Sequence, residues 1–151
     1  MMNIYEVDRR LKQRPPFQMI ERISEYEAGE RAVGHKTVSI NDPWFSGHFP
    51  GTPILPGVLI AESCAQLCSL TVDASETEED KLYVLLKLDG FKFLKPVLPG
   101  DTMDITVTKK SRGGPLISFD AVVTVAGECR AKGTLSFTAL ERKTLDGGAE
   151  A

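Results

Sequence analysis

The sequence has few cysteines, little net charge and no long hydrophobic segment. Its three cysteines are an odd number without regular spacing, which argues against the disulfide framework of a small secreted domain and favours free thiols in a reducing compartment. A formal net charge of −3 gives no sign of a nucleic-acid partner. Proline, glycine or glutamate interrupts every apolar run well before the ~18 residues that a membrane-spanning helix needs, and the N-terminus lacks the pattern of a secretory signal. These absences predict a cytoplasmic protein that contacts neither nucleic acid nor a membrane.

The chain does contain enough apolar material for one domain. With 151 residues and a hydrophobic content of 42%, it is long enough for a real core and too short for two comfortable domains. We predict a single domain over residues 1–140. Turn-forming and small residues predominate over 141–151, which predicts a flexible C-terminal tail.

The segment 57–72 predicts one long helix with apolar residues on almost every face. Such a helix is mostly buried in a protein core. The narrow polar stripe that remains consists of Glu62, Gln66, Ser69 and Asp73. Cys64 and Cys68 lie one turn apart on this helix, and because no pair of histidines completes a zinc site, core packing is the better interpretation of both.

Strands account for most of the remaining chain. After a short helix or turn over 5–14, strands are expected over 17–27, 30–40, 82–88, 91–95, 102–108, 117–125 and 129–137, with a polar loop over 73–81. Short turns connect several of these strands, so the pairing is expected to be mainly antiparallel and the domain to be of the α+β class. A sheet curled around the helix and a flatter sheet with the helix on one face both fit this order of elements.

The residues best suited to chemistry flank a loop rich in proline and glycine. His48 opens this loop and Glu62 follows it, on the predicted helix. A histidine has its ordinary pKa near neutrality, and a carboxyl group among apolar residues is pushed toward its neutral, proton-donating form, so the pair suits removal and return of a proton. Gly57, at the predicted helix start, places its backbone N–H where it can hold a ligand oxygen.

Each of these residues also has a purely structural interpretation. His48 can be a histidine satisfied within the loop, Glu62 can belong to a solvated helix face, and Gly57 can serve the turn alone. His35 lies on a predicted strand with no motif around it, and we assign it a structural role.

Three segments, residues 38–45, 47–51 and 56–62, closely resemble in order and spacing the motifs of the FabZ-type 3-hydroxyacyl-[acyl-carrier-protein] dehydratases. The second of these reads Gly-His-Phe-Pro-Gly and contains His48, and the third ends at Glu62. The likeness continues through segments 14–17, 65–66 and 92–101.

The resemblance implies the hotdog fold, in which a curved, mainly antiparallel sheet wraps one long helix. It also implies a homodimer joined edge to edge, with trimers of dimers in many members, and a dehydration that needs no metal or other cofactor. The substrate would be a 3-hydroxyacyl chain on the phosphopantetheine of acyl carrier protein, and the product the trans-2-enoyl thioester of fatty acid biosynthesis. His48 of one protomer would act as the base, Glu62 of the other as the acid, and Gly57 would bind the thioester oxygen.

Further roles follow from the same resemblance. The walls of an acyl tunnel would be formed by Phe49, Leu59, Ile60, Val84, Phe91 and Phe93. The acidic carrier protein would be bound by Lys92, Lys95, Lys110 and Arg112. Many members place a gating tyrosine where this chain has Val84, and because neighbouring residues of a strand face opposite sides, Tyr83 is not expected to replace it.

Other functions are compatible with the same sequence. The nearest alternative is the same dehydration in a specialised polyene or polyketide pathway. Another alternative is the hydration of a CoA-linked substrate. A thioesterase on the same fold would need a water-activating carboxylate, and the intact loop and Glu62 argue against it. A non-catalytic partner subunit would be expected to lack His48 or Glu62, and this chain has both.

Overall fold

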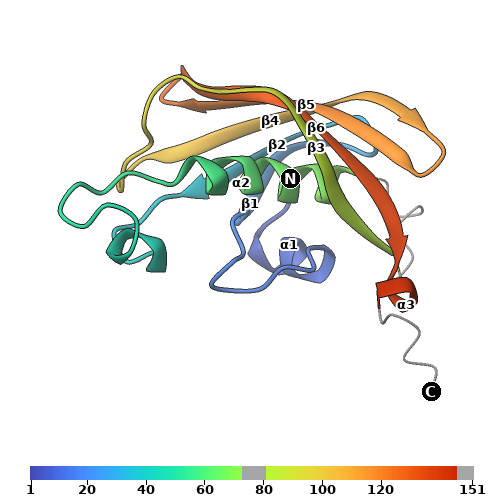
Figure 1. The fold of residues 1–151 in the computed structure, drawn as a ribbon, viewed down its shortest axis with the longest axis horizontal. Helices are drawn as coiled ribbons and strands as arrows, with labels where there is room; N and C mark the ends of the chain where they lie inside the picture. Colours follow the sequence, from blue (N-terminus) through green and yellow to red (C-terminus); the bar gives the residue numbers. More distant parts are fainter. Residues whose placement is uncertain (73–80, 146–151) are drawn as a thin grey trace.

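A single antiparallel sheet of six strands, in the order β1-β2-β4-β5-β6-β3, curves over one long helix (Figure 1). The computed structural model describes residues 1–72 and 81–145. The elements are α1 (Ile4–Arg10), β1 (Arg22–Glu27), β2 (Arg31–Thr37), the 3-10 helix η1 (Pro43–Ser46), α2 (Gly57–Thr71), β3 (Lys81–Phe93), β4 (Thr102–Gly113), β5 (Leu116–Val125), β6 (Glu128–Glu141) and α3 (Arg142–Leu145). This confirms the α+β class and, of the two arrangements left open, the sheet that wraps the helix.

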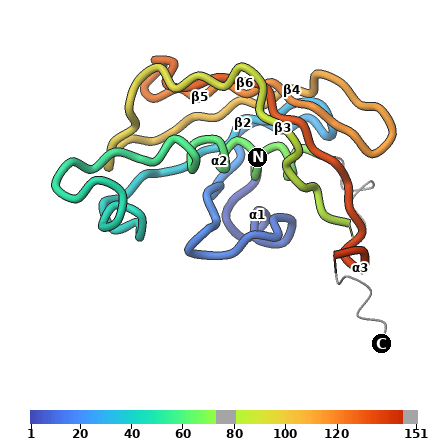
Figure 2. Tube along the Cα trace, in the orientation of Figure 1, coloured from blue at the N-terminus to red at the C-terminus, as the bar shows by residue number. Residues whose placement is uncertain are grey.

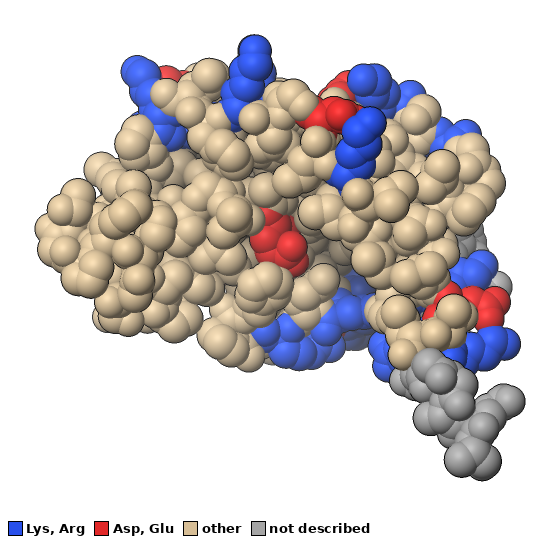
Figure 3. All heavy atoms as spheres, in the orientation of Figure 1, with Lys and Arg blue, Asp and Glu red and all other residues tan. Residues whose placement is uncertain are grey.

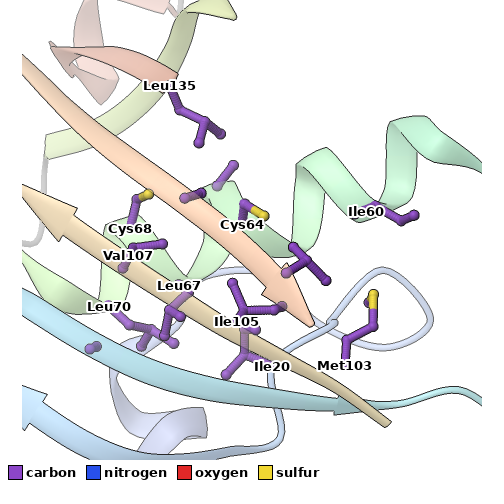
Figure 4. Packing of buried hydrophobic residues seen from close by; sticks show 14 of the residues in the cluster. Ile20, Ile60, Cys64, Leu67, Cys68, Leu70, Met103, Ile105, Val107 and Leu135 are labelled. Carbon is purple, nitrogen blue, oxygen red and sulfur yellow. The ribbon is translucent and has the colours of Figure 1, made fainter. Parts of the chain in front are cut away.

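The core lies between α2 and the concave face of the sheet. Inward-facing residues of β4, such as Ile105, are fully buried against helix residues such as Cys64 and Leu67 (Figure 4). Gly34 on β2 permits this close approach, because a Cβ atom there would lie 2.7 Å from Leu67 Cδ1. Cys64 and Cys68 are buried core residues, and burial raises the pKa of the Cys64 thiol to about 12, so this thiol is unreactive near neutral pH.

The ends of α2 are fixed by different parts of the chain. Pro56 precedes its first residue, and at its C-terminal end the Arg10 guanidinium donates to the Leu70 carbonyl at 2.8 Å. The same guanidinium donates to the Tyr26 hydroxyl at 2.8 Å, which ties α1 to β1 and α2 together. Figure 2 shows the resulting arrangement, with α1 on the side of α2 away from the sheet. No helix in the described ranges is long and apolar enough to cross a membrane.

Several predicted boundaries differ from the observed ones. β1 begins at Arg22 rather than at residue 17, because the backbone around Phe17 and Met19 binds a side chain of α2 instead of joining the sheet. The expected strands 82–88 and 91–95 form one long strand, β3, whose register against β6 shifts between Asp89 and Lys92, where Gly90 has a φ of 55°.

Two predictions concern segments that the structure describes in part or not at all. The beginning of the predicted tail forms α3 directly after β6, and residues 146–151 lie outside the described residues. Residues 73–80 of the expected polar loop, including Asp73 of the helix stripe, also lie outside the described residues.

Candidate active site

His48 is held by backbone carbonyls on two sides. Its backbone N–H donates to the Trp44 carbonyl at 3.0 Å, and its ring Nδ1 lies 3.0 Å from the Ile54 carbonyl oxygen. Because a carbonyl only accepts hydrogen bonds, the Nδ1 contact requires a proton on Nδ1 and leaves Nε2 of the neutral ring as the basic nitrogen. The ring of Phe49 packs against the imidazole with 4.2 Å between ring centroids. The contact with Ile54 thus fixes the orientation of the ring and leaves Nε2 as the nitrogen that could take a proton.

Glu62 lies one turn into α2 and is half-buried. Its Oε1 accepts a hydrogen bond from Gln66 Nε2 at 3.1 Å. Burial raises the pKa of Glu62 above its ordinary value, and the hydrogen bond from Gln66 opposes this with a smaller effect. A carboxyl group of this kind is suited to give up a proton as a general acid.

Gln66 connects Glu62 to the N-terminal segment. It is only 1% exposed, its Nε2 also donates to the Phe17 carbonyl at 2.9 Å, and its Oε1 accepts from the Met19 backbone N–H at 2.8 Å. Gln66 is thus a hydrogen-bonding neighbour of Glu62 on the polar stripe. Ser69, the next residue of this stripe, is half-buried and donates to the Gln66 carbonyl at 2.8 Å.

Replacement of Gln66 by Met is expected to raise the pKa of Glu62 further, since it removes the hydrogen bond that stabilises the carboxylate. It also leaves the Met19 N–H and the Phe17 carbonyl without their partner, which should cost ~1–3 kcal/mol of unfolding free energy. A carbon-13 NMR titration of the Glu62 carboxyl and chemical denaturation measure the two effects. Ser69→Ala, one turn along the same stripe, is the control and should leave the Glu62 pKa unchanged. An unchanged pKa in Gln66→Met would refute the assigned contact.

Gly57 is the first residue of α2, so its backbone N–H has no acceptor within the helix and points outward at the positive end of the dipole. A Cβ atom at this position would lie 3.3 Å from Phe93 Cε1. The structure therefore brings an aromatic residue of β3 against the helix start. The absence of a side chain at Gly57 allows Phe93 to approach closely. This is compatible both with a backbone N–H that holds a ligand oxygen and with a glycine needed only for the turn.

The other residues proposed for the tunnel fall into two groups. Phe91 and Phe93 lie side by side with 5.3 Å between ring centroids, Leu59 is half-buried against the core, and Ile60 is buried within it. Tyr83 packs against the core and Val84 lies on the opposite face of β3, 38% exposed, so within one protomer Val84 is apart from the aromatic pair. The tunnel roles, including that of the exposed Phe49, stay predictions.

The four basic residues proposed for carrier binding do not form one cluster. Lys92 and Lys95 lie near the end of β3, where Lys95 forms an ion pair with Glu128 at 2.9 Å. Lys110 and Arg112 lie at the far end of β4, where Arg112 pairs with Ile117. Lys132, which the sequence analysis did not single out, lies directly opposite Lys92 on β6. Only strand register reveals this neighbour, because forty residues separate the two lysines in the sequence.

His35 has the structural role that we assigned to it. Its Nδ1 lies 2.7 Å from Asp104 Oδ1 and its Nε2 lies 2.7 Å from Ser24 Oγ, so the ring links β1, β2 and β4. Within the described ranges, no group of three or more His, Cys, Asp or Glu residues is arranged to hold a metal ion.

Comparisons with known proteins show the family of this chain. The model of the FabA-like domain family matches residues 11–133. The 3-hydroxyacyl-[acyl-carrier-protein] dehydratase FabZ of Clostridioides difficile (strain 630) is 38% identical over 142 residues, which cover 94% of this chain and 100% of that protein. FabZ of Roseiflexus castenholzii is 41% identical over 137 residues, which cover 91% of this chain and 96% of that protein.

Solved structures share the fold at low sequence identity. The dehydratase heterocomplex ApeI:P from Xenorhabdus doucetiae has a TM-score of 0.76 and 18% identity, and covers 93% of this chain and 95% of that chain. A hypothetical thioesterase with coenzyme A from Streptococcus pneumoniae has a TM-score of 0.61 and 17% identity, covering 80% and 85%. At such identities the likeness shows the hotdog fold alone. The match of the family model over most of the chain and the FabZ relatives together show that this chain belongs to the FabA-like domain family of hotdog-fold proteins.

Proposed function

We infer that this protein is a 3-hydroxyacyl-[acyl-carrier-protein] dehydratase of fatty acid biosynthesis, a hydro-lyase that forms the trans-2-enoyl thioester. This conclusion rests mainly on the pair His48 and Glu62: an imidazole whose Nδ1 is held by the Ile54 carbonyl, so that Nε2 is the nitrogen left to take a proton, and a half-buried carboxyl group with a raised pKa. Both lie on the motifs that match the family, and the curated relatives are named for this activity.

The two groups perform the two halves of a dehydration. His48 Nε2 removes the proton α to the thioester, and Glu62 protonates the 3-hydroxyl group, which leaves as water when the double bond forms. Each positioned group is typically worth ~10²–10⁴-fold in rate. Negative charge moves onto the thioester oxygen during proton removal, and the Gly57 N–H is placed to stabilise it, a contribution of about 3 kcal/mol in comparable enzymes.

The active form is a homodimer joined through β3, in which His48 of one protomer meets Glu62 of the other. Two observations support this. The side-chain hydrogen bonds of His48 and Glu62 that the described protomer shows run to Ile54 and Gln66 respectively, not to each other. β3 lies at the edge of the sheet and exposes apolar side chains, among them Leu86 at 60%. Figure 3 shows this side of the molecule, where uncharged residues cover most of the surface, an acidic group lies near the middle, and Lys and Arg lie mainly toward the upper and lower margins. Further assembly into a trimer of dimers is compatible with these features.

The substrate is carried on phosphopantetheine by acyl carrier protein. Lys92, together with Lys132 beside it, provides positive charge near Phe93 and Gly57, where the acyl chain would enter between the aromatic pair and the start of α2. Such charges chiefly steer association with an acidic partner. Lys110 and Arg112, at the far end of β4, would contact the carrier only across the assembled dimer. The site of action is the cytoplasm, where this pathway operates.

Intact-mass analysis of 3-hydroxyacyl-carrier protein incubated with the enzyme tests the function. We expect loss of one water from the loaded carrier, and slower turnover of the same acyl chain on coenzyme A. Release of the free acid, which leaves the carrier unloaded, would instead indicate a thioesterase. Intact substrate across short and long chains would refute the dehydratase assignment.

A further inference from the structure

Lys36 on β2 is a buried cation outside the catalytic pair. It is only 5% exposed, because its side chain points to the inner side of the sheet, where Ala32 and Gly34 of the same strand are also buried. Burying a lysine is costly unless opposite charge compensates it. Here compensation comes from two carboxylates, since Lys36 Nζ lies 3.6 Å from both Glu21 Oε1 and Asp42 Oδ2.

One of these carboxylates belongs to the loop that carries His48. Asp42 precedes η1 directly, and its Oδ2 also accepts a hydrogen bond from the Ser39 backbone N–H at 3.1 Å. Its side chain makes no capping hydrogen bond to η1. The ion pair between Lys36 and Asp42 therefore attaches the start of the loop to β2.

Lys36 also contacts Trp44, two residues after Asp42 in the loop. Its Nζ lies 5.9 Å from the centroid of the Trp44 ring, within the range of a cation–π interaction. The Trp44 indole N–H is buried and has no hydrogen-bond partner in the part of the chain that the structure describes. The ring is therefore held by packing and by the lysine rather than by a hydrogen bond of its own.

Trp44 leads directly to the catalytic histidine. Its carbonyl accepts hydrogen bonds from the Gly47 N–H at 3.2 Å and the His48 N–H at 3.0 Å. A shift of Trp44 thus moves the backbone of His48 relative to the Ile54 carbonyl that orients its ring.

We propose that Lys36 is a positioning residue for His48, acting through Asp42 and Trp44 to fix the loop from which the histidine projects. This inference rests on the proposed dehydratase function, and it adds a residue that touches neither substrate nor the reacting atoms. Misplacement of a catalytic group by about 1 Å can cost ~10²-fold in rate, so a buried anchor of this kind has a measurable effect on turnover.

The test compares Lys36→Met, which keeps the length and apolar volume of the side chain, with wild type. We expect kcat to fall by ~10–100-fold with KM changed less than about twofold, because substrate binding is retained while the base is misplaced. Trp44 is the only tryptophan in the chain, so its fluorescence reports on the loop directly. Its emission should shift and its quenching by acrylamide should increase.

Two further variants keep the test decisive. Asp42→Asn removes the loop carboxylate and leaves the lysine in place, so it should lower kcat in the same way. The kcat of the double variant should be no lower than that of the less active single variant, because both changes break the same contact. Lys109→Met is the matched control: Lys109 is a partly buried lysine paired with Glu30 at the other end of β2 and β4, and its loss should change neither kcat nor Trp44 emission.

The outcomes separate this inference from the proposed function. A Lys36→Met protein that dehydrates substrate as fast as the Lys109→Met control would overturn the inference, as would a loss of kcat without any change at Trp44. If wild type itself shows no dehydration, the proposed function fails, and the Trp44 quenching comparison alone decides whether Lys36 holds the loop.

Discussion

Substitution of His48 or Glu62 by Gln is expected to lower kcat for dehydration by ~10²–10⁴-fold, because each change removes one positioned proton-transfer group. Glutamine at position 48 lacks the basic ring nitrogen. Glutamine at position 62 keeps the size of the side chain but has no acidic proton to give. The rate of enoyl-thioester formation in a single turnover on loaded carrier protein measures both effects.

Stability measurements distinguish a catalytic role of Glu62 from a structural one. Burial raises the pKa of Glu62 in the folded protein, so its ionised form is less favourable there than in the unfolded chain. The resulting loss of stability develops as the pH rises from the unfolded-state pKa to the folded-state pKa, and it is complete above the latter. Neutral Gln removes that cost at neutral pH, and the Tm of Glu62→Gln should equal or exceed that of wild type. If both Tm and activity fall strongly in Glu62→Gln, the role of Glu62 is structural.

His35→Gln is the matched control for His48→Gln. His35 makes two side-chain hydrogen bonds across three strands, so its loss should reduce stability. It lies away from the proposed chemistry, and kcat of the folded variant should be close to wild type. Equal losses of kcat in the two variants would remove the distinction between a catalytic and a structural histidine.

Substitution of Leu86 by Lys is expected to produce inactive monomers. Leu86 is 60% exposed on β3, the edge strand through which the dimer would form, and two lysines facing each other there would repel and disrupt strand pairing. Because neither protomer alone would unite His48 with Glu62, activity should fall with the dimer. Sedimentation velocity and the dehydration assay, both at the same protein concentration, measure the two losses.

Val122→Lys provides the comparison for this prediction. Val122 is 40% exposed, but β5 is paired with a strand on each side, so a lysine there meets solvent on the outer face of the sheet. The variant should stay dimeric and active. A monomeric Leu86→Lys protein with full activity would contradict the shared site.

The central helix could be predicted from the sequence, and His48 and Glu62 could be proposed as the catalytic pair, because both features leave local signals. The apolar run of 57–72 has helical spacing and a proline and glycine at its start, and the observed α2 spans Gly57–Thr71. Apolar and polar residues also alternate over 102–108, where a strand was expected, and the apolar Met103, Ile105 and Val107 are the buried residues of this part of β4. Fold class and family followed from these elements and from the motif around His48.

Other features depend on contacts that the sequence does not display. The apolar run over 82–88 predicts a strand but not its place in the sheet, and β3 lies at an open sheet edge with several apolar side chains exposed. Lys36 occupies an inward position where the alternation predicts an apolar residue, and its partners come from segments before and after its own strand. The late start of β1 depends on Gln66, which binds the backbone at Phe17 and Met19 from almost fifty residues away.

We propose that His48 of one protomer and Glu62 of the other form one dehydration site. The most direct test is a purified heterodimer of one His48→Gln and one Glu62→Gln protomer, each carrying a different affinity tag. A shared site predicts that this heterodimer retains about half of the wild-type kcat, because two-fold symmetry leaves one of its two sites with both groups intact. A heterodimer as inactive as either parent would contradict the shared site.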